Sequence, residues 1–227
     1  LSKLSHDDNK EKFSEYIVKS SNSIILLVIP ISIGAIVLSK PIVKLLFERG
    51  AFDISATLMT ASALSMYSIG LVAYGLRDII NKVFYSLQDT KTPMINGAIA
   101  MGLNIVLNII FVKFMGHAGL ALATSLSALI CTFLLFYSLR KKIGNFGQEK
   151  ILTTAIKSLL SAILMGVCVT FAHAFIINHT GTGFIGQVIS ILVSVLAGVI
   201  VYGISVIILK IEEVSMIIDL LMKKIRR

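Results

Sequence analysis

Charged residues are scarce in this chain. Of its 227 residues, 15% are charged and 56% are hydrophobic, whereas a soluble domain carries about 25% charged residues. Several runs of about 20 residues hold almost no charge, which is the pattern of membrane-spanning helices. A water-soluble fold of this composition would expose too much apolar surface. The composition therefore predicts a polytopic membrane protein and excludes an ordinary soluble domain.

Cysteines and catalytic groupings are also scarce. Cys131 and Cys168 both lie in apolar runs, which predicts small buried side chains and no disulfide. The sequence has no Cys/His metal spacing, no glycine-rich phosphate loop after a strand and no nucleophile–histidine–acid trio. These absences favour a transport or scaffolding protein over an enzyme. The net charge of +9 would suit nucleic acid, but the basic residues lie beside the apolar runs, so nucleic acid is not an expected partner.

Long apolar stretches are what the chain does contain, and they predict an all-α bundle of six transmembrane helices. The helices are expected at about 21–38, 56–80, 94–114, 120–139, 152–177 and 184–209. The second is expected to start at a cap provided by Asp53 or Ser55 and to continue to Ser86. Pro30 is expected to kink the first helix. The mixed segment 40–53 is expected at the membrane interface.

These stretches divide the chain into five parts. The expected parts are a cytoplasmic loop (1–20), four transmembrane helices (21–139), a basic cytoplasmic loop (140–150), two further transmembrane helices (151–209) and a cytoplasmic tail (210–227). Apolar residues of the tail fall on one helical face, which predicts an interfacial helix. Because the chain opens with Leu1 and a polar segment, it is expected to be a piece of a longer polypeptide or a trimmed product.

Lysine and arginine are distributed unequally between the two sides of the predicted bundle. One side holds 17 of the 21, and the other holds only Lys40, Lys44, Arg49 and Lys113. Basic loops of membrane proteins remain in the cytoplasm. The count therefore predicts that both termini and the segment 84–93 are cytoplasmic, whereas segment 47–53 faces outward.

The third predicted helix is unusually polar for a membrane span. Thr92 is expected to be its N-cap, with Pro93 at the first helical position. Asn104 and Asn108 are four residues apart, so their side chains share one face, and Thr124 lies one turn into the next helix. Their oxygens, with a carbonyl near Leu120, could coordinate a hard monovalent cation. The alternative, which the residues alone favour, is hydrogen bonding across the helix interface, worth about 0.6–2 kcal/mol each.

Four further polar residues are candidates for contact with a substrate or a gate. Arg49 either forms a surface pair with Glu48 or contacts an anionic headgroup, and the surface pair is the simpler expectation. Arg77 is near a helix end, where anchoring by snorkelling is the simpler expectation. Gln88 and Asp89 are expected in a tight turn, where they are candidates for contacts with a cytoplasmic gate.

Three segments resemble the MurJ (MviN) family of lipid II flippases, within the multidrug/oligosaccharidyl-lipid/polysaccharide exporter superfamily. They are LLFERGAFD at 45–53, YSIGLVAYGLRDIINKVFYSLQDTKTPM at 67–94 and GHAGLALATSLSA at 116–128. The resemblance implies fourteen helices in the whole protein: two six-helix lobes and two C-terminal helices. This chain would run from the loop after the eighth helix through the fourteenth, with cytoplasmic termini, in the bacterial plasma membrane.

The resemblance also implies a function. The chain would be the C-terminal portion of a lipid II flippase that works by alternating access in peptidoglycan synthesis. Its partners would be membrane lipids, the lipid-linked peptidoglycan precursor and the missing N-terminal lobe, without which it is expected to be inactive. The last two helices would contribute to a groove for the lipid tail.

A sodium site is a further implication of the resemblance. Some members of the family hold Na⁺ at positions that correspond to Asn104, Asn108, Leu120 and Thr124. Asn108 replaces an expected carboxylate, and loss of negative charge weakens a cation site, so a weak Na⁺ site is expected. Two alternatives remain for the function as a whole. One is another exporter of the superfamily, for an O-antigen lipid or for drugs and cations, and the other is a membrane interaction module that transports nothing.

Overall fold

The computed structural model describes residues 10–181, 183–211 and 213. Every regular element in this part of the chain is an α-helix. The helices are α1 (Lys10–Val37), α2 (Ser39–Phe47), α3 (Ile54–Ile69), α4 (Leu71–Ser86), α5 (Lys91–Met115), α6 (His117–Ile143), α7 (Gln148–Thr180) and α8 (Phe184–Ile208). Within the described residues, six helical stretches are long and apolar enough to cross a membrane, with α3 and α4 forming one of them. The predicted all-α membrane bundle is confirmed.

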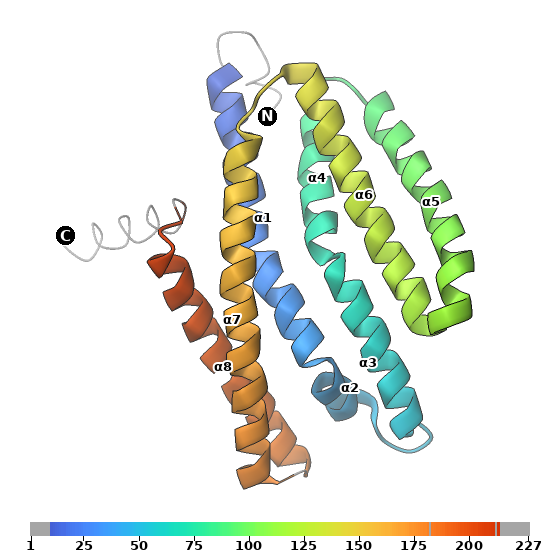
Figure 1. Cartoon of the computed structure of the whole chain (residues 1–227), viewed down its shortest axis with the longest axis vertical. Coiled ribbons are helices and arrows are strands. Elements are labelled where there is room, and N and C mark those ends of the chain that lie inside the picture. The colour runs from blue at the N-terminus through green and yellow to red at the C-terminus, as the bar shows by residue number, and fades with distance from the viewer. Residues whose placement is uncertain (1–9, 182, 212, 214–227) are drawn as a thin grey trace, which may run out of the picture.

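The long helices lie side by side, and short connections join them at the two ends of the bundle (Figure 1). The α1 helix packs on α4 and α7, and α6 packs on α3, α4 and α5. The α5 and α8 helices lie at opposite edges of the bundle, against α6 and α7 respectively. One end carries α2, the α5–α6 turn and the α7–α8 connection, and is called the α2 end below. The opposite end carries the start of α1 and the α4–α5 turn, and is called the Asp89 end.

Buried aliphatic and aromatic side chains join α1 to α4, α6 and α7. The largest fully buried members of this cluster are Ile17, Ile25, Ile80, Phe84, Leu135 and Leu139. The helix α1 begins at Lys10, earlier than the predicted span, because Phe13 and Ile17 already bury their side chains in this core. Part of the predicted loop 1–20 is therefore helical, and α1 continues through Pro30 without ending. The predicted interfacial helix at 210–227 lies almost wholly outside the described residues.

The second membrane span is interrupted at Gly70, where the sequence predicts a continuous helix to Ser86. The Ser125 hydroxyl of α6 donates to the carbonyl oxygens of Met66 at 2.6 Å and Tyr67 at 3.2 Å. These carbonyls would otherwise accept only from the next turn of their own helix. A Cβ at Gly70 would lie 2.8 Å from Ser125 Cα, so only glycine permits this close approach. The break is thus caused by a contact with a helix far along the chain.

Candidate functional site

The four residues of the predicted cation site come together between α5 and α6. The Asn108 amide donates to Asn104 Oδ1 at 3.0 Å, and the Asn104 amide lies 3.5 Å from Thr124 Oγ1. The Thr124 hydroxyl donates to the Leu120 carbonyl at 2.9 Å. The spacing argument from the sequence placed these side chains correctly. They form one polar chain across the interface between two apolar helices.

The oxygen atoms of this cluster can be compared with the ligands that a cation requires. Asn108 Oδ1 is buried and accepts no hydrogen bond from the described residues. The four contributing groups are neutral, and no group of three or more histidine, cysteine or acidic residues occurs among the described residues. Neutral oxygens suit a loosely held monovalent cation better than a divalent one, whose sites usually include carboxylates. These residues supply oxygen ligands of the type that Na⁺ binds. None of them carries the negative charge that would balance the ion.

The third asparagine of α5 has a packing role. The Asn96 amide donates to Ser138 Oγ at 3.2 Å, and the Cys131 thiol lies 3.8 Å from the Asn96 carbonyl oxygen. Because backbone and amide groups in hydrocarbon need partners, this bond accounts for an asparagine in an apolar helix. Hydrogen bonding across the α5–α6 interface is therefore established at Asn96 and, through Asn104 and Thr124, at the candidate site as well.

At the Asp89 end, the turn between α4 and α5 is held by a carboxylate. Asp89 Oδ1 accepts from the Thr92 backbone N–H at 2.9 Å, and Asp89 Oδ2 accepts from the Thr92 hydroxyl at 2.8 Å. Lys142, near the end of α6, places its ammonium 2.5 Å from Asp89 Oδ2. The bond from Lys142, aided by the N–H of Thr92, lowers the pKa of Asp89 from 3.8 to about 2. Asp89 thus caps α5 and ties α5 to the end of α6.

The predicted cap at Thr92 is therefore wrong. The helix α5 already begins at Lys91, so Thr92 and Pro93 lie inside its first turn. Asp89 supplies the accepting oxygen because its carboxylate reaches the free N–H of Thr92 in that turn and also carries a charge that suits a helix N-terminus. The sequence signal that could have identified this cap is the acidic residue three positions before Thr92.

Gln88 has a structural role in the same turn. Its backbone has a φ of 56°, in the left-handed region that non-glycine residues rarely adopt. The Asp89 N–H donates to the Phe84 carbonyl at 2.9 Å, and the Gln88 N–H donates to the Tyr85 carbonyl at 3.0 Å. This is the Schellman pattern that ends a helix, with glutamine where glycine is usual. The conformation of Gln88 therefore directs the chain from α4 to α5.

The two candidate arginines lie outside this turn, Arg77 within α4 and Arg49 after α2. The Arg77 guanidinium lies 5.3 Å from the centre of the Tyr74 ring on the same helix, a cation–π distance. Arg49 is exposed in the segment after α2, at the opposite end of the bundle from Gln88 and Asp89. Glu48, its expected partner, lies 3.9 Å from Lys44 instead. The four candidate residues therefore do not form one site.

Comparisons with known proteins match this fold and these segments. A family model described as "Lipid II flippase MurJ" matches residues 1–193. The chain is 31% identical to the lipid II flippase MurJ of Thermosipho africanus over 202 residues, covering 89% of this chain and 38% of that protein. It is 35% identical over 167 residues to a probable lipid II flippase MurJ of Vibrio cholerae, covering 73% of this chain and 32% of that protein.

The chain belongs to the lipid II flippase MurJ family. A solved structure titled "Lipid II flippase MurJ, inward closed conformation" superposes on it with a TM-score of 0.70 and 28% identity. That match covers 90% of this chain and 41% of the solved one. The chain thus spans about two fifths of the length of the relatives it matches. Family membership and the apolar helices together establish an integral membrane protein.

Proposed function

We propose that this chain is the C-terminal portion of a lipid II flippase. The flippase would move undecaprenyl-pyrophosphate-linked muropeptide across the bacterial plasma membrane for peptidoglycan synthesis. The observation that carries the proposal is the family match over residues 1–193, together with the superposition over 90% of the chain. Transport by alternating access moves a substrate without making or breaking its bonds, so the chain acts as part of a transporter and not as an enzyme.

The described helices supply the mechanical part of that function. The α3–α4 break at Gly70 separates two rigid half-helices, each held against α6. A membrane helix interrupted at a glycine is a natural position for bending between two transporter states. The Asp89–Lys142 contact fixes the Asp89 end of α5 and α6, so motion is concentrated at the break.

The remainder of the transporter is the principal partner of this chain. A cavity accessible from alternate sides needs two lobes, and this chain spans about two fifths of its relatives. The chain alone therefore does not flip lipid. Its outward-facing apolar residues, most numerous on α5, α7 and α8, contact membrane lipids.

Both ends of the chain lie in the cytoplasm in this proposal, and the α2 end faces outward. The distribution of lysine and arginine supports it, because 17 of the 21 belong to loops and helix ends on one side. Single cysteines placed at Ser55 and at Ser86, on a cysteine-free background, test the orientation with a membrane-impermeant maleimide. Labelling of the Ser55 position alone in intact cells supports it, and labelling of the Ser86 position alone reverses it.

A second candidate function is weak Na⁺ binding by Asn104, Asn108, Leu120 and Thr124. The unpartnered, buried Asn108 Oδ1 favours it, because such an acceptor is costly without a donor or a cation. These residues would hold the ion, which would supply positive charge between α5 and α6 and bring their amide oxygens closer together. Without it, the side chains already bind one another, so the ion is expected to modulate transport and not to be required for it.

A chimaera tests the proposed transport function in cells. The matched portion of the Thermosipho africanus flippase is replaced by this chain, and the chimaera is expressed in bacteria depleted of their own flippase. Restored growth, with lipid II reaching the outer leaflet, is the expected result, and the chain alone should restore neither. Restored efflux of organic cations without restored lipid II transport would instead indicate a drug or cation exporter.

A further inference from the structure

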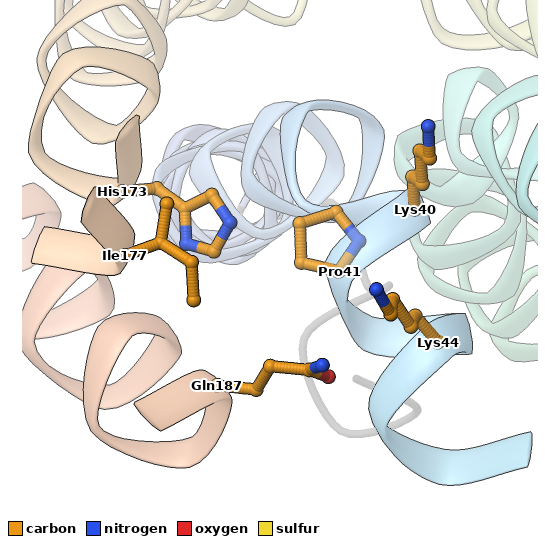
Figure 2. Close-up of a pocket in the computed structure, with 6 residues that line it drawn as sticks. All are labelled: Lys40, Pro41, Lys44, His173, Ile177 and Gln187. Atoms are coloured by element: carbon orange, nitrogen blue, oxygen red, sulfur yellow. The ribbon is translucent and has the colours of Figure 1, made fainter. Parts of the chain in front are cut away.

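A small pocket opens at the α2 end, away from the residues considered above. Its volume is about 170 Å³, and it is lined by Lys40, Pro41, Lys44, His173, Ile177 and Gln187. These residues come from three helices, α2, α7 and α8 (Figure 2). Because α2 packs on α8 and α7 packs on α8, the pocket is a junction between the short helix and the final hairpin.

The polar groups of the pocket converge on its interior. Figure 2 shows the Lys44 ammonium directed into the pocket beside Pro41, while the His173 ring faces Pro41 across it. Lys40 runs along the edge, with its ammonium turned away. The Ser190 hydroxyl donates to the His173 carbonyl oxygen at 3.2 Å and lies 2.7 Å from His173 Nδ1, which therefore donates to it. These bonds orient the ring, which helps to form the wall of the pocket.

The charge of the pocket is positive. None of its six lining residues is acidic. Glu48 does not line the pocket, but it forms a loose ion pair with Lys44, with 3.9 Å between its carboxylate oxygen and the ammonium. This pair offsets part of the positive charge, and Lys40 adds a second positive charge. Gln187 lies in the first turn of α8, and the amino end of a helix carries partial positive charge. A cavity that is lined by hydrogen-bond donors and by no carboxylate favours an anionic ligand.

The size and surroundings of the pocket indicate which class of ligand it can hold. Drug-sized ligands occupy cavities of about 300–1,000 Å³, so a cavity of about 170 Å³ suits a single small group. The same turns of α7 and α8 expose Phe175, Phe184 and Ile185, each about two thirds exposed or more, on their outer surface. Apolar side chains of this kind face lipid tails in a membrane. An anionic group that arrives here is therefore expected on a lipid.

We propose that this pocket binds the phosphodiester group of an anionic membrane lipid at the α2 end of the bundle. The Lys44 ammonium pairs with a phosphate oxygen, and the Gln187 amide donates to another. Lys40 adds charge from the edge, and the lipid tails lie along α7 and α8. Binding here would join α2 to the final hairpin, which are linked otherwise by packing.

The test measures lipid binding to the purified 227-residue chain in detergent by native mass spectrometry. Phosphatidylglycerol is compared with zwitterionic phosphatidylcholine, and inorganic phosphate is added as a competitor in a separate arm. The variants are Lys44→Gln, which removes the charge, and Gln187→Leu, which removes the amide and keeps the charge. Lys113→Gln is the matched control, because Lys113 is an exposed lysine at the same end but outside the pocket.

The expected result is that phosphatidylglycerol binds more tightly than phosphatidylcholine. Its affinity should fall about tenfold in Lys44→Gln, as for the loss of one charge-assisted hydrogen bond. Gln187→Leu should show a smaller loss, and Lys113→Gln should bind like the parent chain. Equal binding by Lys44→Gln and Lys113→Gln would overturn the proposal. Displacement of phosphatidylglycerol by inorganic phosphate at millimolar concentration would also overturn it, because the pocket would then be a site for the free ion.

Discussion

The change Asp89→Asn tests whether one carboxylate holds the Asp89 end together. Asparagine keeps the shape of the side chain, and its oxygen can still accept from the Thr92 N–H. Its NH₂ group, however, meets the Thr92 hydroxyl and the Lys142 ammonium, which both donate to Asp89. Asparagine caps a helix about as well as aspartate, so the loss comes from two other contacts. A solvent-exposed ion pair is worth about 0.2–1 kcal/mol, and the hydrogen bond from the Thr92 hydroxyl about 0.5–1.5 kcal/mol. Because the Lys142 side chain is 40% exposed, we expect a total loss of about 1–2 kcal/mol.

Thermal unfolding of the purified chain in detergent measures this loss. For a protein of this size, 1 kcal/mol shifts the Tm by about 2–4 °C, so Asp89→Asn should lower the Tm by several degrees. Asp78→Asn is the matched control, because Asp78 is exposed on α4 and makes no ion pair among the described residues. In a double-mutant cycle with Lys142→Gln, the effects should not add. Equal Tm values for Asp89→Asn and the parent chain would refute the stabilising role of the Asp89 charge.

The pH dependence of the same interaction has a definite sign. The pKa of Asp89 is lowered from 3.8 to about 2 in the folded chain, mainly by Lys142. The stabilisation is therefore complete above pH 3.8, declines below it and is lost as the pH falls through about 2. The Tm difference between the parent chain and Asp89→Asn should narrow over this range. A difference that stays constant down to pH 2 would contradict the assigned pKa.

The remaining predictions concern three other positions. Gly70→Ala should lower the Tm by several degrees, because its Cβ would lie 2.8 Å from Ser125 Cα and overpacking costs about 1–3 kcal/mol; an unchanged Tm would contradict this contact. Gln88→Gly should raise the free energy of unfolding by about 0.5–1 kcal/mol, because glycine adopts the φ of 56° without strain; a loss in denaturant titration would refute it. In Asn108→Asp, the Tm should rise with NaCl but not with choline chloride. The new carboxylate supplies the negative charge that the site lacks, and a bound ion stabilises the folded state. Equal responses to both salts would exclude a cation site there.

The helices could be predicted from the sequence because their cause is local. Apolar runs of sufficient length form helices in a membrane whatever their neighbours. The grouping of Asn104, Asn108 and Thr124 was also predictable, since helical periodicity and a short turn between α5 and α6 determine which faces meet. The choice between hydrogen bonding and cation binding was not predictable, because both use the same side chains in the same place.

The other features depend on contacts between distant parts of the chain. Gly70 reads as an ordinary small residue until Ser125 is seen to bond to the carbonyls before it. Asp89 was assigned to a turn, but its partner Lys142 comes from the end of another helix. The small pocket at the α2 end is lined by Lys44, His173 and Gln187, which come from three helices. Sequence spacing carries no signal for such groupings, because only tertiary packing brings them together.

The central claim is that this chain is the C-terminal portion of a lipid II flippase and needs the remainder of the transporter. Its most direct test is the rate at which lipid II crosses the bilayer of liposomes that contain the purified Thermosipho africanus chimaera. The account predicts translocation by the chimaera at a rate near that of the unmodified relative, and background leakage in liposomes that contain this chain alone. Translocation by the chain alone, or background leakage with a chimaera that is folded and inserted, would contradict it.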